Sequence, residues 1–183
     1  MKLDLNYLLE VSIKAVCEAS EEILKIYNDA NFNVEKKQDG SPITLADKNA
    51  NKVIENILST TNIPILSEEG KDIMYEERKS WDYFWLVDPL DGTKEFVKKN
   101  GEFTVNIALI KNGQPLLGVI LVPVTNVLYF SSLNLGSFKS NDLAFHNFKI
   151  SDLVNLSTKL PLIKERECYT VVSSRSHVTH ETE

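Results

Sequence analysis

The chain has 183 residues, 43% hydrophobic and 25% charged, which is enough for one ordinary hydrophobic core and part of a second. Its formal net charge of -6, without a stripe of lysine and arginine, argues against a nucleic-acid backbone as partner. Cys17 and Cys168 lie far apart and outside any Cys/His metal-ligand spacing, which predicts reduced cysteines in a cytoplasmic protein and argues against a disulfide scaffold or a zinc site.

The first segment, about Asp4 to Tyr27, is predicted to be an amphipathic helix that covers the core. Its apolar residues recur at helical spacing, and glutamates with Lys25 fill the other face. The opening MKLDLNYLLE carries acidic residues where a signal peptide needs positive charge, and no stretch has the length of a membrane span. A short strand is expected at Asn33–Lys37, followed by a turn at Asp39–Pro42.

The segment that begins at Thr44 is predicted to be a second amphipathic helix. Thr44 is expected to be its N-cap, and Asp47 stands at the third helical position. An acidic residue in the first turn also complements the helix dipole. Asp47 therefore has two interpretations, as a residue that caps its own helix and as a carboxylate of a functional site.

Two glutamates follow the next predicted strand, Ile63–Leu66. The motif Ser-Glu68-Glu69-Gly comes directly after this strand, just as Asp88 follows the apolar run Trp85–Val87. If the two strands are neighbours, Glu68 meets Asp88. One of the two glutamates can simply be solvated, and the pattern does not say which.

The stretch Asp88-Pro-Leu-Asp91-Gly-Thr93 is predicted to end its strand in a tight turn. Pro89 suits the second position of such a turn and Asp the first, so the carboxylates of Asp88 and Asp91 are expected to share one small volume. Two carboxylates that close repel each other unless a cation lies between them. Because Mg²⁺ prefers oxygen ligands and completes its shell with waters and phosphate oxygens, the turn predicts a Mg²⁺ site.

An antiparallel meander is predicted after this turn. Phe103–Ile110 alternates apolar and polar residues, Asn112-Gly113 is a strong hairpin signal, and Leu116–Val122 and Val127–Ser132 return as further strands. Before the turn, Lys71–Ser80 is interpreted as a charged surface connection, because it shows no clear periodicity.

The last part of the chain is less regular. Leu133–Arg166 is expected to form a loop, a short strand and a polar segment, whereas Cys168–Val172 is a clear apolar strand. The chain then stops where a helix is starting. We therefore expect an N-terminal fragment of a longer protein, with a metal-binding α+β domain at residues 1–166 and the start of a truncated C-terminal α/β domain at residues 167–183.

The acidic motifs resemble the signature of the inositol monophosphatase superfamily of Mg²⁺-dependent, lithium-sensitive phosphatases. The resemblance rests on Ala-Asp47, Ser-Glu68-Glu69 and WLVDPLDGT, and it covers essentially the whole chain. The extension KEFVKKNGEFTVNIALI and the segment Ser-Arg-Ser-His177 are similar to one branch, the bacterial 3′(2′),5′-bisphosphate nucleotidases. The resemblance implies an α+β fold, a layered α/β sandwich of the inositol monophosphatase/fructose-bisphosphatase type with a helix pair against an antiparallel sheet.

The resemblance also implies a set of metal ligands. Glu68, Asp88 and the backbone carbonyl of Leu90 would hold one Mg²⁺, and Asp88 and Asp91 would hold a second, with two or three ions in all. Asp88 would bridge the first two ions. Two adjacent metals can activate a water and stabilise the leaving oxygen of an in-line phosphoryl displacement.

A catalytic pair and substrate contacts are implied in the same way. Asp47 would polarise the hydroxyl of Thr93, and the pair would orient and deprotonate the attacking water. Thr93 has the alternative role of capping a helix that begins at Lys94, whose first amides would point toward a phosphate oxygen. The implied substrate contacts are Glu68, Gly92, Thr93, Ser174 and His177.

Three interpretations of function remain. The first is a 3′(2′),5′-bisphosphate nucleotidase that converts adenosine 3′,5′-bisphosphate to AMP and phosphate in sulfur assimilation. The second is an inositol or sugar phosphatase of the same superfamily, against which the KEF and NGEF extension argues. The third is a non-catalytic metal-binding or interaction module, because the family's later Trp-Asp motif and much of its adenosine pocket are missing.

A cytoplasmic location and a small-molecule nucleotide partner are expected, whereas peripheral association with the inner membrane and the oligomeric state are left open.

Overall fold

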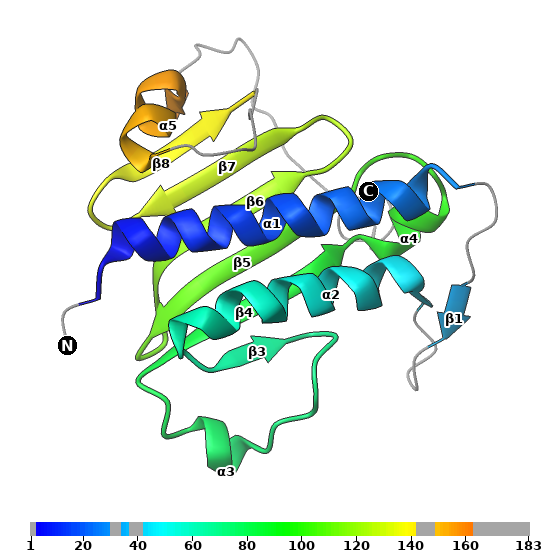
Figure 1. Ribbon diagram of the computed structural model, residues 1–183, viewed down its shortest axis with the longest axis horizontal. Helices are drawn as coiled ribbons and strands as arrows, with labels where there is room; N and C mark the ends of the chain where they lie inside the picture. Colours follow the sequence, from blue (N-terminus) through cyan, green and yellow to red (C-terminus); the bar gives the residue numbers. More distant parts are fainter. Residues whose placement is uncertain (1–2, 30–33, 37–41, 142–148, 163–183) are drawn as a thin grey trace, which may run out of the picture.

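The computed structural model of the protein describes residues 3–29, 34–36, 42–141 and 149–162. Within these ranges, two long helices pack on one face of a seven-stranded sheet (Figure 1), which confirms the predicted α+β fold with its helix pair. The expected division at residue 166 and the expected strand at Cys168–Val172 lie outside the described residues and stay predictions. No helix in the described part of the chain is long and apolar enough to cross a membrane.

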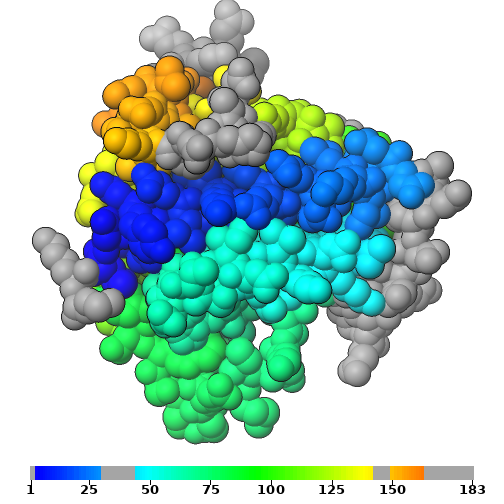
Figure 2. Space-filling model, in the orientation of Figure 1, coloured from blue at the N-terminus to red at the C-terminus, as the bar shows by residue number. Residues whose placement is uncertain are grey.

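The two helices are α1 (Leu5–Tyr27) and α2 (Leu45–Leu58), and a short 3-10 turn, η1 (Ser59–Thr61), follows α2. Helix α1 begins after Asp4, whose carboxylate accepts hydrogen bonds from two free backbone amides of the first turn, at 3.0 and 3.2 Å. The helices lie side by side across the sheet and form one continuous surface over that face (Figure 2).

The strands of the large sheet follow one another in chain order. They are β3 (Ile65–Ser67), β4 (Tyr83–Asp91), β5 (Thr104–Lys111), β6 (Gln114–Val122), β7 (Val127–Ser132), β8 (Gly136–Ser140) and β9 (Thr158–Lys159). From β4 to β9 every neighbouring pair is antiparallel, so the predicted meander is confirmed. A separate antiparallel pair, β1 (Val34–Lys36) with β2 (Pro42–Thr44), precedes α2.

Strand β3 departs from the antiparallel pattern, because it pairs with β4 in parallel. Parallel neighbours need a crossover connection, since a tight hairpin reverses the chain. Residues 68–82 provide that connection and contain the short helix α3 (Tyr75–Arg78), where the sequence predicted an irregular segment.

The core fills the space between the helices and the sheet. On β5, Val105, Ile107 and Leu109 are buried and alternate with less buried neighbours, as their period of two predicts. The turn to β6 is built on Asn112 and Gly113, which have φ angles of 48° and 76°. Positive φ at both central residues is typical of the type I′ hairpin turn predicted for Asn-Gly.

The segment Leu133–Arg166, predicted to form a loop, a short strand and a polar segment, contains three regular elements in its described part. These are β8, β9 and the helix α5 (Ile150–Leu156). Strand β8 offers little local signal, because Phe138 is its one large apolar residue, and it stacks on Phe130 of β7 at a ring separation of 5.3 Å. Pairing with β7 therefore decides the conformation of β8.

The tight turn predicted at Asp88-Pro89 is wrong. Strand β4 continues to Asp91, and its pairing with β5 shifts register between Asp88 and Asp91. Asp88 faces Asn106 and Asp91 faces Thr104, so β4 carries one more residue than β5 over this interval. Proline is tolerated within a sheet at such a bulge, because the bulge leaves residues out of the hydrogen-bonded ladder.

Gly92 joins the end of β4 to α4 (Thr93–Val97) in a left-handed conformation, with φ 94°. A Cβ atom at Gly92 would lie 3.0 Å from the carbonyl oxygen of Glu102 and 3.3 Å from the Cα of Phe103. The turn therefore requires glycine both for its backbone angles and for its close approach to the chain before β5.

A pair of alanine substitutions separates these two requirements. Gly113→Ala in the hairpin meets positive φ but open space, so it should lower the free energy of unfolding by about 1–2 kcal/mol. Gly92→Ala adds a backbone clash and should cost roughly 1 kcal/mol more. Urea denaturation of the full-length protein measures both values, and an equal or smaller cost at Gly92 would contradict the close packing described here.

Candidate functional site

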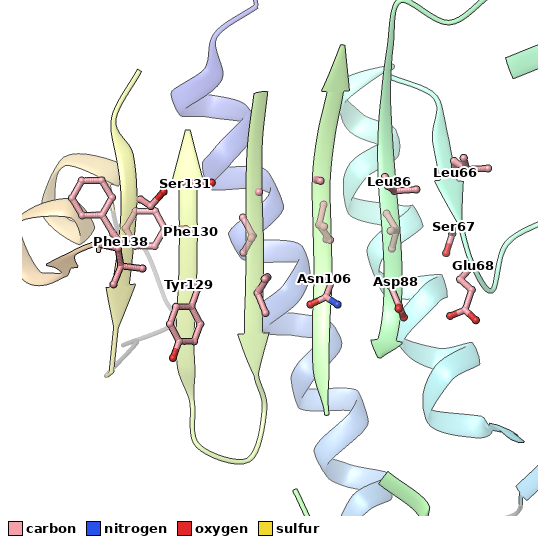
Figure 3. A pocket seen from close by; sticks show the side chains of 18 residues that line it. Leu66, Ser67, Glu68, Leu86, Asp88, Asn106, Tyr129, Phe130, Ser131 and Phe138 are labelled. Carbon is pink, nitrogen blue, oxygen red and sulfur yellow. The ribbon is translucent and has the colours of Figure 1, made fainter. Parts of the chain in front are cut away.

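The face of the sheet opposite α1 and α2 is open in the described part of the chain and carries a broad pocket of about 800 Å³ (Figure 3). Its floor is largely apolar and runs across β3 to β8, with Leu86, Ala108 and Ile120 among the lining residues. At the β3–β4 end the lining turns acidic, with Glu68 and Asp88. The candidate site lies at this acidic end.

The bulge in β4 places the two aspartates on this open face. Residues three apart in a regular strand point to opposite faces, because the side-chain period is two. The extra residue reverses that alternation, so Leu90 is buried with the core whereas Asp91 is exposed. Asp88 and Asp91 thus lie opposite Asn106 and Thr104, which share one face of β5. The two carboxylates are brought together, although by a different backbone from the predicted turn.

Glu68 joins Asp88 from the neighbouring strand, as the sequence predicted. Ser67 pairs with Val87 in parallel register, and the backbone amide of Glu68 donates to the Val87 carbonyl at 3.0 Å. Figure 3 shows the Glu68 and Asp88 side chains at the same end of the two strands. The side chain of Glu68 is exposed, whereas that of Glu69 is more buried.

Asp88 has an unfavourable environment for an ionised carboxylate. Its Oδ1 atom is buried and has no hydrogen-bond partner among the described residues. Burial, and then the negative charges of Glu68 and Asp91, raise the pKa of Asp88 to about 7. The site therefore holds a buried carboxylate oxygen without a hydrogen-bond partner among the described residues, beside the negative charges of Glu68 and Asp91.

Asp47 and Thr93 are brought together from α2 and α4. The Thr93 hydroxyl donates to Asp47 Oδ1 at 3.1 Å, and the Asp47 side chain is fully buried. The other carboxylate oxygen, Oδ2, accepts from the backbone amide of Thr44 at 2.7 Å and from the Thr44 hydroxyl at 2.5 Å. The capping interpretation of Asp47 is therefore confirmed, and the same carboxylate also reaches Thr93. Its role in a functional site stays a prediction.

The expected cap at Thr93 is wrong. Helix α4 starts at Thr93 itself, Gly92 occupies the N-cap position, and no side chain caps this helix. The Thr93 hydroxyl also lies 3.3 Å from the carbonyl oxygen of Leu90. A hydroxyl has one hydrogen to donate, and the shorter contact is the one to Asp47.

Asn106 is a residue of this site that the sequence reasoning missed. Its amide nitrogen donates to Asp91 Oδ2 at 3.1 Å from the next strand of the sheet. The sequence did contain a signal for it, because Asn106 is a polar residue at one of the alternate, less buried positions of β5. This strand is the neighbour of the strand that bears Asp88.

No group of three or more His, Cys, Asp or Glu side chains in the described ranges converges into a ready-made metal site. The arrangement consists of two carboxylate pairs, Glu68 with Asp88 and Asp88 with Asp91, whose charges act on one another. The predicted nucleotide contacts Ser174 and His177 lie outside the described residues and stay predictions.

The chain is similar in sequence to curated bacterial proteins. The chain is 48% identical over 127 residues to the 3′(2′),5′-bisphosphate nucleotidase CysQ of Salmonella typhimurium, covering 66% of this chain and 51% of the relative. It is 40% identical over 180 residues to the protein of the same name in Buchnera aphidicola, covering 94% of this chain and 63% of the relative. The chain thus spans about half to two thirds of the length of these relatives.

Solved structures of bacterial proteins also match this chain. The crystal structure of CysQ from Bacteroides thetaiotaomicron matches with a TM-score of 0.89 and 44% identity, over 99% of this chain and 67% of that one. The extragenic suppressor protein suhB from Bartonella henselae matches with a TM-score of 0.66 and 30% identity, over 74% and 52% of the two chains. The sequence profile described as the inositol monophosphatase family matches residues 4–183, and the chain belongs to this family.

Proposed function

We propose that the full-length protein is a metal-dependent phosphatase that removes the 3′-phosphate of adenosine 3′,5′-bisphosphate and releases AMP and phosphate. The observation that carries this proposal is the hydrogen bond of 3.1 Å from the half-buried Thr93 hydroxyl to the buried Asp47 carboxylate, just after the strand that bears Asp88 and Asp91. Similarity to bisphosphate nucleotidases from several bacteria supports the choice of substrate and a role in sulfur assimilation.

The carboxylate pairs fit Mg²⁺. This ion is usually held by one or two carboxylates, with waters and substrate phosphate oxygens completing its shell, so two pairs suit it better than a cage of many ligands. Asp88 Oδ1, buried and without a donor in the described residues, is an oxygen that a cation would satisfy. Glu68, Asp88 and the Leu90 carbonyl would hold one ion, and Asp88 with Asp91 a second. When bound, the ions supply positive charge for the phosphate and for the oxygen that leaves phosphorus.

Asp47 and Thr93 would move the proton of the attacking water. Because the Thr93 hydroxyl donates its hydrogen to Asp47, its oxygen is left as an acceptor and can take a hydrogen bond from water. As the water attacks phosphorus, its proton can pass to Thr93 while the Thr93 proton passes to Asp47. The two hydrogen bonds from Thr44 hold the Asp47 carboxylate in the orientation that this transfer needs.

The substrate contacts rest on the family pattern. Glu68, Gly92 and Thr93 border the phosphate position in this proposal, and Ser174 and His177 would contact the nucleotide. An inositol or sugar phosphate is the alternative substrate class.

The raised pKa of Asp88 predicts a pH dependence of stability in the absence of metal. The folded state keeps this proton up to about pH 7, whereas the unfolded chain loses it near 3.8. The folded state therefore binds more protons between these values, and raising the pH through this window lowers the free energy of unfolding. Thermal melts of the full-length protein in EDTA should show this decline, and Asp88→Asn should flatten it. An equal decline in both proteins would contradict the assigned cause.

Removal of the Thr93 hydroxyl should impair the chemical step while metal binding is retained. Thr93→Val is expected to lower kcat by about 10²–10⁴-fold, the usual contribution of general acid–base catalysis. Thr93→Ser keeps the hydroxyl and should retain most of the activity. Phosphate release at saturating Mg²⁺ measures these rates. Similar losses in both variants would argue against the proton path through Thr93.

The choice of substrate is tested by phosphate release from adenosine 3′,5′-bisphosphate and from inositol 1-phosphate at matched concentrations. We expect a higher kcat/KM for the nucleotide and loss of its hydrolysis in Asp88→Asn. Equal or reversed rates for the two substrates would refute the nucleotidase assignment. Unchanged Mg²⁺-dependent hydrolysis in Asp88→Asn would refute the mechanism.

A further inference from the structure

Asn106 connects the interior strand β5 to the acidic end of β4. Its neighbours Val105 and Ile107 are buried beneath the helices, and backbone pairing with β4 and β6 holds β5 on both sides. The position of Asn106 is therefore fixed by the core. Its side chain lies on the open face beside Asp88 (Figure 3).

The orientation of the Asn106 amide is determined by chemistry. An ionised carboxylate only accepts hydrogen bonds, so the group 3.1 Å from Asp91 Oδ2 must be the NH₂ group of Asn106. The amide oxygen of Asn106 then points elsewhere, and it is buried without a hydrogen-bond partner among the described residues. An unsatisfied buried acceptor is unfavourable. The buried amide oxygen thus lowers the stability of the folded state, whereas the hydrogen bond of the NH₂ group to Asp91 is a contact that an apolar residue could not make.

The hydrogen bond engages one oxygen of Asp91 and leaves Oδ1 available to a cation. A neutral amide donates without adding charge, whereas a lysine or arginine in its place would neutralise Asp91 and compete with the metal. Asp91 is exposed and would otherwise rotate freely about its side-chain bonds. Hydrogen-bonded partners of this kind orient metal ligands and raise the affinity of the site.

We propose that Asn106 is a positioning residue that fixes the Asp91 carboxylate for the metal shared by Asp88 and Asp91. This inference rests on the proposed function, because it assumes two metal-binding events in the full-length protein. Asn106 would affect binding of the Mg²⁺ held by Asp88 and Asp91. It would have no part in binding the Mg²⁺ held by Glu68 and Asp88.

The test is calorimetric titration of the full-length protein with Mg²⁺ alone, without substrate. Asn106→Leu, similar in size but without a donor, should weaken the Asp91-dependent event by about 10- to 100-fold. The affinity for the Mg²⁺ held by Glu68 and Asp88 should change less than about twofold, because the proposed role of Asn106 involves Asp91 and not Glu68. In Asn106→Ser the side chain is too short to reach Asp91, so this variant should show the same loss of affinity. It replaces the leucine variant if that protein is unstable.

Thr104→Val is the matched control. Thr104 lies on the same face of β5, opposite Asp91, and its isosteric replacement should leave both events and the melting temperature unchanged. Wild-type affinity in Asn106→Leu and Asn106→Ser, or equal weakening of both events, would overturn the role of Asn106 alone. Equal weakening by Thr104→Val would overturn it too. Absence of Mg²⁺ binding by the wild type would instead overturn the proposed function together with this inference.

Discussion

The extra residue that β4 carries between Asp88 and Asp91 is the constraint on which the candidate site depends. Without it, the period of two would turn Asp91 toward the helices and Leu90 toward the open face. With it, Leu90 stays in the core and both carboxylates face the same side. Pro89 is compatible with this geometry because a bulge does not need its missing amide hydrogen. The bulge therefore allows β4 to keep its apolar residues in the core while its two aspartates lie together on the open face.

Segments that are distant in sequence contribute side chains to this acidic patch. The parallel pairing of β3 with β4 delivers Glu68 beside Asp88, and β5 supplies Asn106. The Asp47 carboxylate arrives from α2, where it both caps a helix and holds Thr93. Asp47, Asp88 and Asn106 lie on helices or strands of the packed core, and Glu68 directly follows β3, which suits a site whose chemistry depends on orientation. The stability of the fold and the geometry of the site therefore rest on the same contacts.

Much of this could be predicted from the sequence where local chemistry determines the outcome. The capping box at Thr44, the Asn112-Gly113 hairpin and the alternation along β5 act over a few residues, and each was confirmed. The meeting of Glu68 with Asp88 was predicted as a condition on strand neighbours, and the parallel pairing satisfied it. The family signature implied the roles of these acidic residues, and those roles stay predictions.

The errors share a cause, because long-range pairing overrode a local preference. Asp-Pro suggested a turn, yet pairing with β5 kept the strand extended. Thr93 is a good capping residue by type, but its hydroxyl is engaged by Asp47, which is distant in sequence. Asn106 belongs to no sequence motif. Its hydrogen bond to Asp91 forms only when β4 and β5 are paired, so the sequence alone did not indicate it.

The central claim is that the two carboxylate pairs around Asp88 bind divalent cations. Mn²⁺ shares the oxygen preference of Mg²⁺ and scatters anomalously, so it reports metal positions directly. In crystals of the full-length protein grown with Mn²⁺, the account predicts one anomalous peak between Glu68 and Asp88 and one between Asp88 and Asp91. Each peak should lie within about 2.5 Å of carboxylate oxygens. A map with ordered side chains and no peak in contact with Asp88 would contradict it.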